Sequence, residues 1–288
     1  MSVPPPDLAA HPDLAAHIDR LIDAALAEDI GPGDVTSGSV IPEGLRFRGV
    51  MAAREDMVVA GLPFAAQVFH RVVPEAGVEL AVADGDKVAA GTILARLEGP
   101  ARGMLTAERT ALNLLQHLSG IATLTRTYVD AMAGTGATLL DTRKTIPGLR
   151  LAAKYATRMG GARNHRMGLY DGVLIKDNHI AVCGSVAEAA RRAKQAGTGE
   201  VEVECDTLDQ VAEAVAAGAD IILLDNMAPP VLRQAVALVA GRARTEASGG
   251  VNLDTIRAIA ETGVDFVSVG RLTQSARAVD IGLDWNAE

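Results

Sequence analysis

The feature that most constrains the fold is an alternation of short apolar runs and alanine-rich helical stretches over the second half of the chain. Helical patterns such as residues 186–196 and 208–217 lie between the apolar runs. Strands and helices alternating in this way, joined by right-handed crossovers, predict a parallel sheet covered by helices. Six runs end in polar residues and are spaced 34, 29, 20, 22 and 22 residues apart when counted from Leu140, Leu174, Val203, Leu223, Thr245 and Val267.

The polar residues distinguish between two forms of parallel sheet. An open dinucleotide-binding sheet would carry Gly-x-Gly-x-x-Gly after its first strand, and no such motif follows Leu140. Polar groups instead follow every predicted strand, which is typical of α/β barrels, whose active sites lie at the carboxyl ends of the strands. Six strands are too few for the eight-stranded form, so we predict an irregular, about six-stranded parallel α/β barrel.

The first half of the chain has a different pattern. Apolar residues at helical spacing predict a helix over residues 13–29, short alternating segments at 46–98 predict a small α+β module, and residues 106–132 predict a long helix. We therefore expect a mobile tail at 1–12, an α+β domain at 13–115, a barrel domain at 116–275, and a segment at 276–288 that packs back toward the N-terminal domain.

The composition excludes several classes of protein. The 288 residues include 27 Lys and Arg against 36 Asp and Glu, and this net charge of −9 argues against a protein that coats nucleic acid or an anionic membrane. The chain has neither an apolar stretch of membrane-spanning length nor a signal-like N-terminus. Cys183 and Cys205 form no metal-binding or redox motif, which favours free thiols in the cytoplasm.

Positive charge is concentrated in residues 143–179, which hold eight Lys and Arg against two Asp, while the rest of the chain has a net charge of −15. Such a local excess predicts a pocket for a small polyanion. Arg143, Lys144 and Lys176 each follow an apolar strand, so we assign them to that pocket. We interpret the helical charges of the window as solvated: Arg150, Lys154 and Arg158.

Acidic residues occupy other strands of the predicted barrel. Glu200, Glu202 and Glu204 alternate along one strand, so all three face the barrel interior. Glu204 and Asp225 end neighbouring strands and are candidates to hold a divalent metal such as Mg²⁺ together with substrate phosphates. The alternative is that Glu202 and Glu204 pair with lysines of the basic window.

Glycines after the last two predicted strands indicate a phosphate site. Ser248-Gly249-Gly250 precedes a helix expected to begin near Asn252 or Leu253, and Gly270 follows the last strand. Glycine lets backbone N–H groups approach a phosphate, and this corner is the usual phosphate site of such barrels. His165 lies in the basic window without metal-ligand spacing, so we expect it to hydrogen-bond an anionic substrate.

Seven short motifs stand out when the whole chain is considered. They are Thr106–Asn113, Asp141–Gly148, Asn164–Arg166, Leu174–His179, Glu202–Glu204, Leu224–Asn226 and Glu246–Gly250. In this order they resemble the quinolinate phosphoribosyltransferase family over roughly residues 20–285. The resemblance implies an N-terminal open-faced α+β sandwich, a C-terminal irregular barrel, and a head-to-tail homodimer with shared active sites. It leaves assembly above the dimer open.

The resemblance also implies an activity. Members of this family transfer a phosphoribosyl group from 5-phosphoribosyl 1-diphosphate to quinolinate with loss of CO2, giving nicotinate mononucleotide and diphosphate for NAD biosynthesis. We expect Mg²⁺ to accompany the donor. No organic cofactor is expected, because the cationic ring nitrogen formed by the transfer can accept the electrons that the departing carboxylate leaves behind.

The family's site residues map onto this sequence by motif. Those implied to contact the pyridine dicarboxylate are Arg143, His165, Arg166 and Lys176, with Lys144 nearby and Arg109 reaching from the other subunit. Glu204 and Asp225 resemble the acidic pair near the ribose hydroxyls and Mg²⁺. The residues resembling the 5-phosphate site are Ser248, Gly249, Gly250 and Gly270. Whether Lys144 or Lys176 assists decarboxylation or only binds substrate is left open.

Three other functions compete with this one. A related phosphoribosyltransferase, such as the relatives found with molybdate-transport genes, would use another acid acceptor, but the basic cluster favours a dicarboxylate. A Schiff-base aldolase would use Lys144 or Lys176 as its nucleophile. A non-catalytic phosphosugar-binding protein would bind ligands without turnover.

Overall fold

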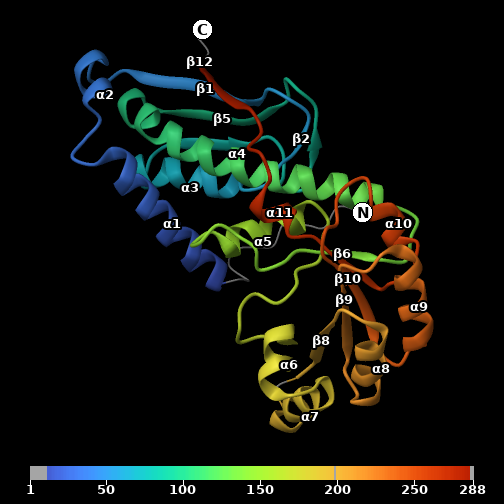
Figure 1. The fold of residues 1–288 in the computed structure, drawn as a ribbon. Coiled ribbons are helices and arrows are strands. Elements are labelled where there is room, and N and C mark those ends of the chain that lie inside the picture. Colours follow the sequence, from blue (N-terminus) through green and yellow to red (C-terminus); the bar gives the residue numbers. More distant parts are fainter. Residues whose placement is uncertain (1–11, 198, 286–288) are drawn as a thin grey trace. The chain divides into compact units, whose positions relative to one another are not determined.

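A computed structural model describes residues 12–197 and 199–285, and these form two compact units. The first unit comprises described residues 12–126, 146–161 and 275–285, and the second comprises 127–145 and 162–274. The chain thus leaves the first unit and returns to it twice (Figure 1). The expected N-terminal tail lies, apart from Pro12, outside the described residues.

The first unit contains a four-stranded antiparallel sheet in the order β12-β1-β5-β3. Its strands are β1 (Arg46–Ala53), β3 (Gly77–Leu80), β5 (Ile93–Pro100) and β12 (Ile281–Trp285), and a separate pair is formed by β2 (Met57–Val58) and β4 (Lys87–Val88). The C-terminal segment, expected to pack toward this part of the chain, supplies β12, which pairs with β1. The helices are α1 (Pro12–Ile30), α2 (Val35–Val40), α3 (Leu62–Val72), α4 (Ala101–Ala131) and α5 (Arg150–Met159).

A buried carboxyl group organises the core of this unit. Asp84 accepts hydrogen bonds from the backbone N–H groups of Gly61 and Leu62, at 2.7 and 3.0 Å, and from the hydroxyl of Tyr155 at 2.5 Å. It therefore caps the start of α3 and ties α5 to it. Burial raises the pKa of Asp84.

Lys154 corrects one prediction. We interpreted it as a solvated helix charge, but its side chain is fully buried in α5. The reason is that α5 packs inside the core of the first unit, where it is buried on almost all sides together with Ala152, Tyr155 and Thr157. The sequence suggested otherwise because Arg150, Lys154 and Arg158 recur at every fourth residue, which is the spacing of a solvated helix face.

The second unit contains the predicted six-stranded parallel sheet, in the order β6-β11-β10-β9-β8-β7. The strands are β6 (Thr138–Leu140), β7 (Val173–Ile175), β8 (Val201–Cys205), β9 (Ile221–Asp225), β10 (Arg244–Ser248) and β11 (Phe266–Ser268). Within the described residues no ladder joins β6 to β7, and a single parallel bridge links Leu140 to Arg163. The predicted fold class is confirmed, in an irregular form that is open at this position.

Helices connect these strands as expected. They are α6 (Asp177–Cys183), α7 (Val186–Ala196), α8 (Leu208–Ala216), α9 (Pro229–Val239), α10 (Ile256–Ala260) and α11 (Arg271–Gln274). The helix expected to begin at Asn252 or Leu253 begins only at Ile256. The prediction was wrong because the Asn252 side chain accepts the backbone N–H groups of Asp254 and Thr255, which makes a turn before the helix.

The register of the sheet aligns the carboxyl ends of its strands. Ser248 pairs with Asp225, Glu204 pairs with Leu223, and Ser268 pairs with Leu140. Residues that are far apart in sequence therefore meet at one edge, as the barrel prediction required. No helix in the described residues combines the length and apolarity needed to cross a membrane.

Candidate active site

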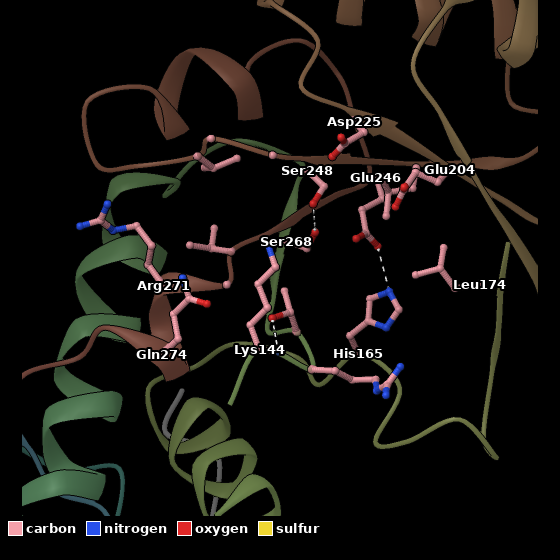
Figure 2. A pocket seen from close by; sticks show the side chains of 18 of the residues that line it. Lys144, His165, Leu174, Glu204, Asp225, Glu246, Ser248, Ser268, Arg271 and Gln274 are labelled. Carbon is pink, nitrogen blue, oxygen red and sulfur yellow. Dashed lines mark hydrogen bonds and ion pairs between the residues drawn. The ribbon is translucent and has the colours of Figure 1, made fainter. Parts of the chain in front are cut away.

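A cavity of about 490 Å³ lies at the carboxyl ends of the parallel strands in the second unit (Figure 2). Every predicted site residue except Arg109 lines it: Arg143, Lys144, His165, Arg166, Lys176, Glu204, Asp225, Ser248, Gly249, Gly250 and Gly270. Arg109 belongs to the first unit, where it lies exposed on α4. Six strands or the loops that follow them thus contribute to one cavity.

Two guanidinium groups form a cationic part of this cavity. The Nε of Arg143 is buried and has no hydrogen-bond partner among the described residues. Arg166 donates one hydrogen bond to the carbonyl of Gly172 at 3.1 Å, and burial together with the nearby charge of Arg143 lowers the pKa of Arg166. Two half-buried cations side by side need an anion to offset their repulsion, and planar guanidinium groups suit carboxylates.

The segment that carries Arg166 is held by a buried aspartate at the end of β6. Asp141 is fully buried and accepts hydrogen bonds from the side-chain amide of Asn164 and from the backbone N–H of His165. These bonds fix the backbone from which the His165 and Arg166 side chains project. The short motifs around residues 141 and 164 are therefore joined in space.

Both ring nitrogens of His165 contact groups of the protein itself. Its Nδ1 accepts a hydrogen bond from the backbone N–H of Arg166 at 2.7 Å. Its Nε2 lies 3.1 Å from a carboxylate oxygen of Glu202 and 3.6 Å from one of Glu246. Both ring nitrogens are thus engaged by protein groups, although the ring lines the cavity. We expected this ring to hydrogen-bond the substrate. The structure shows that Nδ1 accepts a backbone hydrogen bond and that Nε2 faces two carboxylates of the protein.

The acidic pair lies at the ends of neighbouring strands, as predicted. Lys176 donates to Glu204, so the expected alternative, in which this glutamate pairs with a lysine, is present. Glu202 instead faces His165. Burial, followed by the charges of Glu204 and Asp206, raises the pKa of Asp225. This electrostatic environment favours a cation, and the carboxylate oxygens of Glu204 and Asp225 are ligands of the type that Mg²⁺ prefers.

The loop after β10 has a backbone that only glycine fits. Gly249 has a φ of +86°, and a Cβ atom there would lie 2.2 Å from the Oδ1 atom of Asn226. Ser268 donates a hydrogen bond to the hydroxyl of Ser248 at 3.0 Å, which links β11 to the start of this loop. The resulting turn leaves room for an anion to approach the backbone.

Lys144 lies at the same end of the cavity as this loop. A Cβ atom on Gly270 would lie 2.7 Å from the Cδ atom of Lys144, so the lysine side chain crosses this glycine closely. The Thr273 hydroxyl donates a hydrogen bond to the Lys144 carbonyl at 2.7 Å. In Figure 2 the amine of Lys144 points toward Ser268. The lysine therefore lies beside Gly270, one of the residues expected to bind the 5-phosphate.

Some lining residues were not among the predicted site residues. They are Thr142, Leu174, Leu223, Glu246, Val251, Asn252, Ser268, Val269, Arg271 and Gln274. A signal for Glu246 existed, because it lies two residues before Ser248 on one strand and therefore shares its face. Ser268 carries the same signal relative to Gly270.

Comparison with known proteins extends this description. The family model for the quinolinate phosphoribosyl transferase N-terminal domain matches residues 34–119, and that for the C-terminal domain matches residues 121–284. A protein of Bacillus subtilis named as a probable nicotinate-nucleotide pyrophosphorylase (carboxylating) is 43% identical over 269 residues, which cover 93% of each chain. A protein of Mycobacterium leprae named as nicotinate-nucleotide pyrophosphorylase (carboxylating) is 45% identical, over 91% of this chain and 95% of its own.

A solved structure agrees with these sequence matches. The nicotinate-nucleotide pyrophosphorylase of Francisella tularensis superposes with a TM-score of 0.91 and 42% sequence identity. The match covers 94% of this chain and 96% of the other. Fold, motifs and length therefore agree with the same group of proteins.

Proposed function

Because the chain belongs to the quinolinate phosphoribosyltransferase family, we propose that it transfers the phosphoribosyl group of 5-phosphoribosyl 1-diphosphate to quinolinate. The adjacent carboxylate is lost in the process, and the products are nicotinate mononucleotide, diphosphate and CO2, in NAD biosynthesis. The observation that carries this assignment is one cavity that brings together a cationic part formed by Arg143 and Arg166, the acidic residues Glu204 and Asp225, and a glycine loop at Ser248–Gly250.

The cationic part of the cavity binds the acceptor in this proposal. Quinolinate carries two neighbouring carboxylates, and the guanidinium groups of Arg143 and Arg166 can bind them with paired hydrogen bonds. Fixing both carboxylates orients the ring nitrogen toward the sugar carbon that it attacks. The half-buried, ion-paired Lys176 adds a third positive charge.

Other residues of the cavity bind the phosphoribosyl donor in this proposal. The loop Ser248-Gly249-Gly250, Gly270 and Lys144 receive the 5-phosphate, and Glu204 and Asp225 face the ribose. As diphosphate leaves, positive charge develops on the sugar ring, and carboxylates stabilise that charge where it forms. When bound, Mg²⁺ held by Glu204 and Asp225 supplies charge neutralisation for the departing diphosphate.

The ion pair of Lys176 argues against an aldolase mechanism. A Schiff base forms through an amine that is free to attack a carbonyl carbon, whereas the amine of Lys176 donates a hydrogen bond to the carboxylate of Glu204. The exposed Lys144 lies against Gly270, in the phosphate-binding part of the cavity.

We also propose a homodimer in which Arg109 completes the acceptor site of the other subunit. The exposed position of Arg109 on α4 is compatible with such a role. The protein is further proposed to work in the cytoplasm, where its two free cysteines, Cys183 and Cys205, remain reduced.

Binding measurements on two variants test the assignment of the two substrates. Arg143→Ala removes a half-buried guanidinium group that, in this proposal, binds a carboxylate of quinolinate. The affinity for quinolinate should therefore fall about 10- to 100-fold, while the affinity for the donor changes little. Asp225→Asn should instead weaken binding of 5-phosphoribosyl 1-diphosphate with Mg²⁺ by about 10-fold. Calorimetric titration of each variant with each substrate measures both. Equal loss of both affinities in either variant would count against the assignment.

A further inference from the structure

Three titratable side chains meet inside the barrel without a role in the proposed substrate binding. Nε2 of His165 lies 3.1 Å from Glu202 and 3.6 Å from Glu246, and single ligand atoms of the three residues lie within 4.8 Å of one another. Glu202 and Glu246 are 4% and 1% exposed. The second oxygen of each carboxylate, Oε1, is buried and has no hydrogen-bond partner in the described residues. We call these three residues the central cluster.

The central cluster separates two cavities. His165 and Glu246 line the substrate cavity at the carboxyl ends of the strands. The same two residues and Glu202 line a second cavity of about 540 Å³ near the amino ends of the strands. The second cavity reaches solvent, because exposed residues such as Arg163 and Glu200 also line it. Glu246 therefore forms part of the wall of both cavities.

The geometry of the central cluster indicates which of its three side chains hold a proton. Nδ1 of His165 accepts a backbone hydrogen bond, so the ring proton is on Nε2 and points toward the carboxylates. Two buried carboxylates this close do not both ionise. Burial, followed by the charge of Glu202, raises the pKa of Glu246, while His165 and the hydroxyl of Ser268 on β11 act in the opposite direction. The cluster thus keeps a proton on Glu246 near neutral pH.

The proposed reaction needs such a proton. After phosphoribosyl transfer, the bond between C2 of the pyridinium ring and its carboxylate breaks, CO2 leaves, and the electron pair stays on C2 beside the cationic nitrogen. Nicotinate mononucleotide carries hydrogen at this carbon, so a donor must protonate it. Until that happens, CO2 can recombine with the carbanion.

We propose that the carboxyl group of Glu246 donates this proton to C2, that His165 and Glu202 position this carboxyl group, and that Glu246 takes its replacement proton directly from the second cavity, which it also lines. The O–H bond of Glu246 breaks as the C2–H bond forms, and water in the second cavity restores the lost proton. No electrons are gained or lost by the protein. This inference rests on the proposed decarboxylating activity and adds the source of its proton.

A Glu246→Gln variant tests the donor. Glutamine keeps the size of the side chain and can hydrogen-bond Glu202, but it cannot release a proton to carbon. In a single turnover with enzyme in excess, diphosphate and CO2 are measured separately by rapid quench. We expect diphosphate formation close to that of the unaltered enzyme, CO2 formation slowed about 10²-fold or more, and accumulation of quinolinate mononucleotide.

The matched control is Glu261→Gln, which changes an exposed glutamate that pairs with Arg257 at the surface and lines neither cavity. Both rates should remain unchanged in this variant. The proposal is overturned if a folded Glu246→Gln protein loses diphosphate and CO2 formation equally, or loses neither. Failure of the unaltered enzyme to form diphosphate from quinolinate would instead contradict the proposed function.

A second measurement needs no variant and remains informative if Glu246→Gln does not fold. In the unaltered enzyme, the first-turnover rate of CO2 formation should fall as pH rises through the elevated pKa of Glu246, because the donor loses its proton. Diphosphate formation should not follow this decline. A rate of CO2 formation that stays level over the same pH range would contradict the proposal.

Discussion

Gly249 shows how a single residue shapes the phosphate-binding part of the cavity. Its φ of +86° lies in the region that side chains rarely adopt, and Asn226, against which it packs, also has a positive φ, of 54°. The backbone N–H of Asn226 also donates a hydrogen bond to the carbonyl of Ser248, the residue before Gly249. A closely packed turn of this kind holds backbone N–H groups in fixed positions.

Replacing this glycine should therefore weaken donor binding selectively. In Gly249→Ala, the new methyl group meets Asn226 and forces the loop to move. We expect KM for 5-phosphoribosyl 1-diphosphate to rise about 10-fold or more, which corresponds to about 1.4 kcal/mol, with KM for quinolinate little changed. Steady-state kinetics with each substrate varied in turn measures this.

The matched control is Gly218→Ala. Gly218 has a similar φ of +77°, but a Cβ atom there would meet nothing within 4 Å, and it lies outside the cavity lining. This variant should lose about 1 kcal/mol of stability from backbone strain and retain both KM values. A similar effect of the two variants on donor KM would show that general destabilisation, and not the loop, is responsible.

At the scale of helices and strands, much of the second unit could be predicted from its sequence. Each strand is an apolar run with a polar residue at its end, and the period of two places Glu202 and Glu204 on one face. The predicted residues therefore meet in one cavity once the parallel register is set. Periodicity was sufficient here because the sheet is buried on one side by helices and lined by polar groups on the other.

Other elements could not be predicted, for physical reasons. The segment containing α5 returns to the first unit, and no local signal in its alanine-rich sequence indicates this tertiary packing or the burial of Lys154. The late start of α10 depends on side-chain hydrogen bonds of Asn252, which compete with the helix. The central cluster was missed because the proximity of His165 to Glu246 depends on contacts across the barrel, which sequence spacing does not reveal.

At the scale of the whole molecule, the proposed dimer gives Arg109 its role. This exposed arginine does not line the cavity of its own second unit. If each active site takes Arg109 from one chain and Lys176 from the other, a heterodimer of Arg109→Ala and Lys176→Ala chains contains one intact site and one site with both defects.

Mixing the two inactive proteins should therefore restore activity. Random exchange at equal concentrations should give about a quarter of the unaltered activity, because half of the dimers are mixed and each has one intact site. The measurement requires differently tagged chains, so that the heterodimer can be isolated and assayed. An isolated heterodimer with no activity would contradict shared sites, and the two homodimers provide the baseline.

The most direct test of the central claim is the stoichiometry of the reaction itself. The purified protein is incubated with quinolinate, 5-phosphoribosyl 1-diphosphate and Mg²⁺, and nicotinate is supplied as the acceptor in a parallel reaction. We predict CO2 and nicotinate mononucleotide in equal amounts from quinolinate, and no mononucleotide from nicotinate, which lacks the second carboxylate that the Arg143 and Arg166 pair requires. Turnover with nicotinate alone, or none with quinolinate by folded protein, would contradict the account.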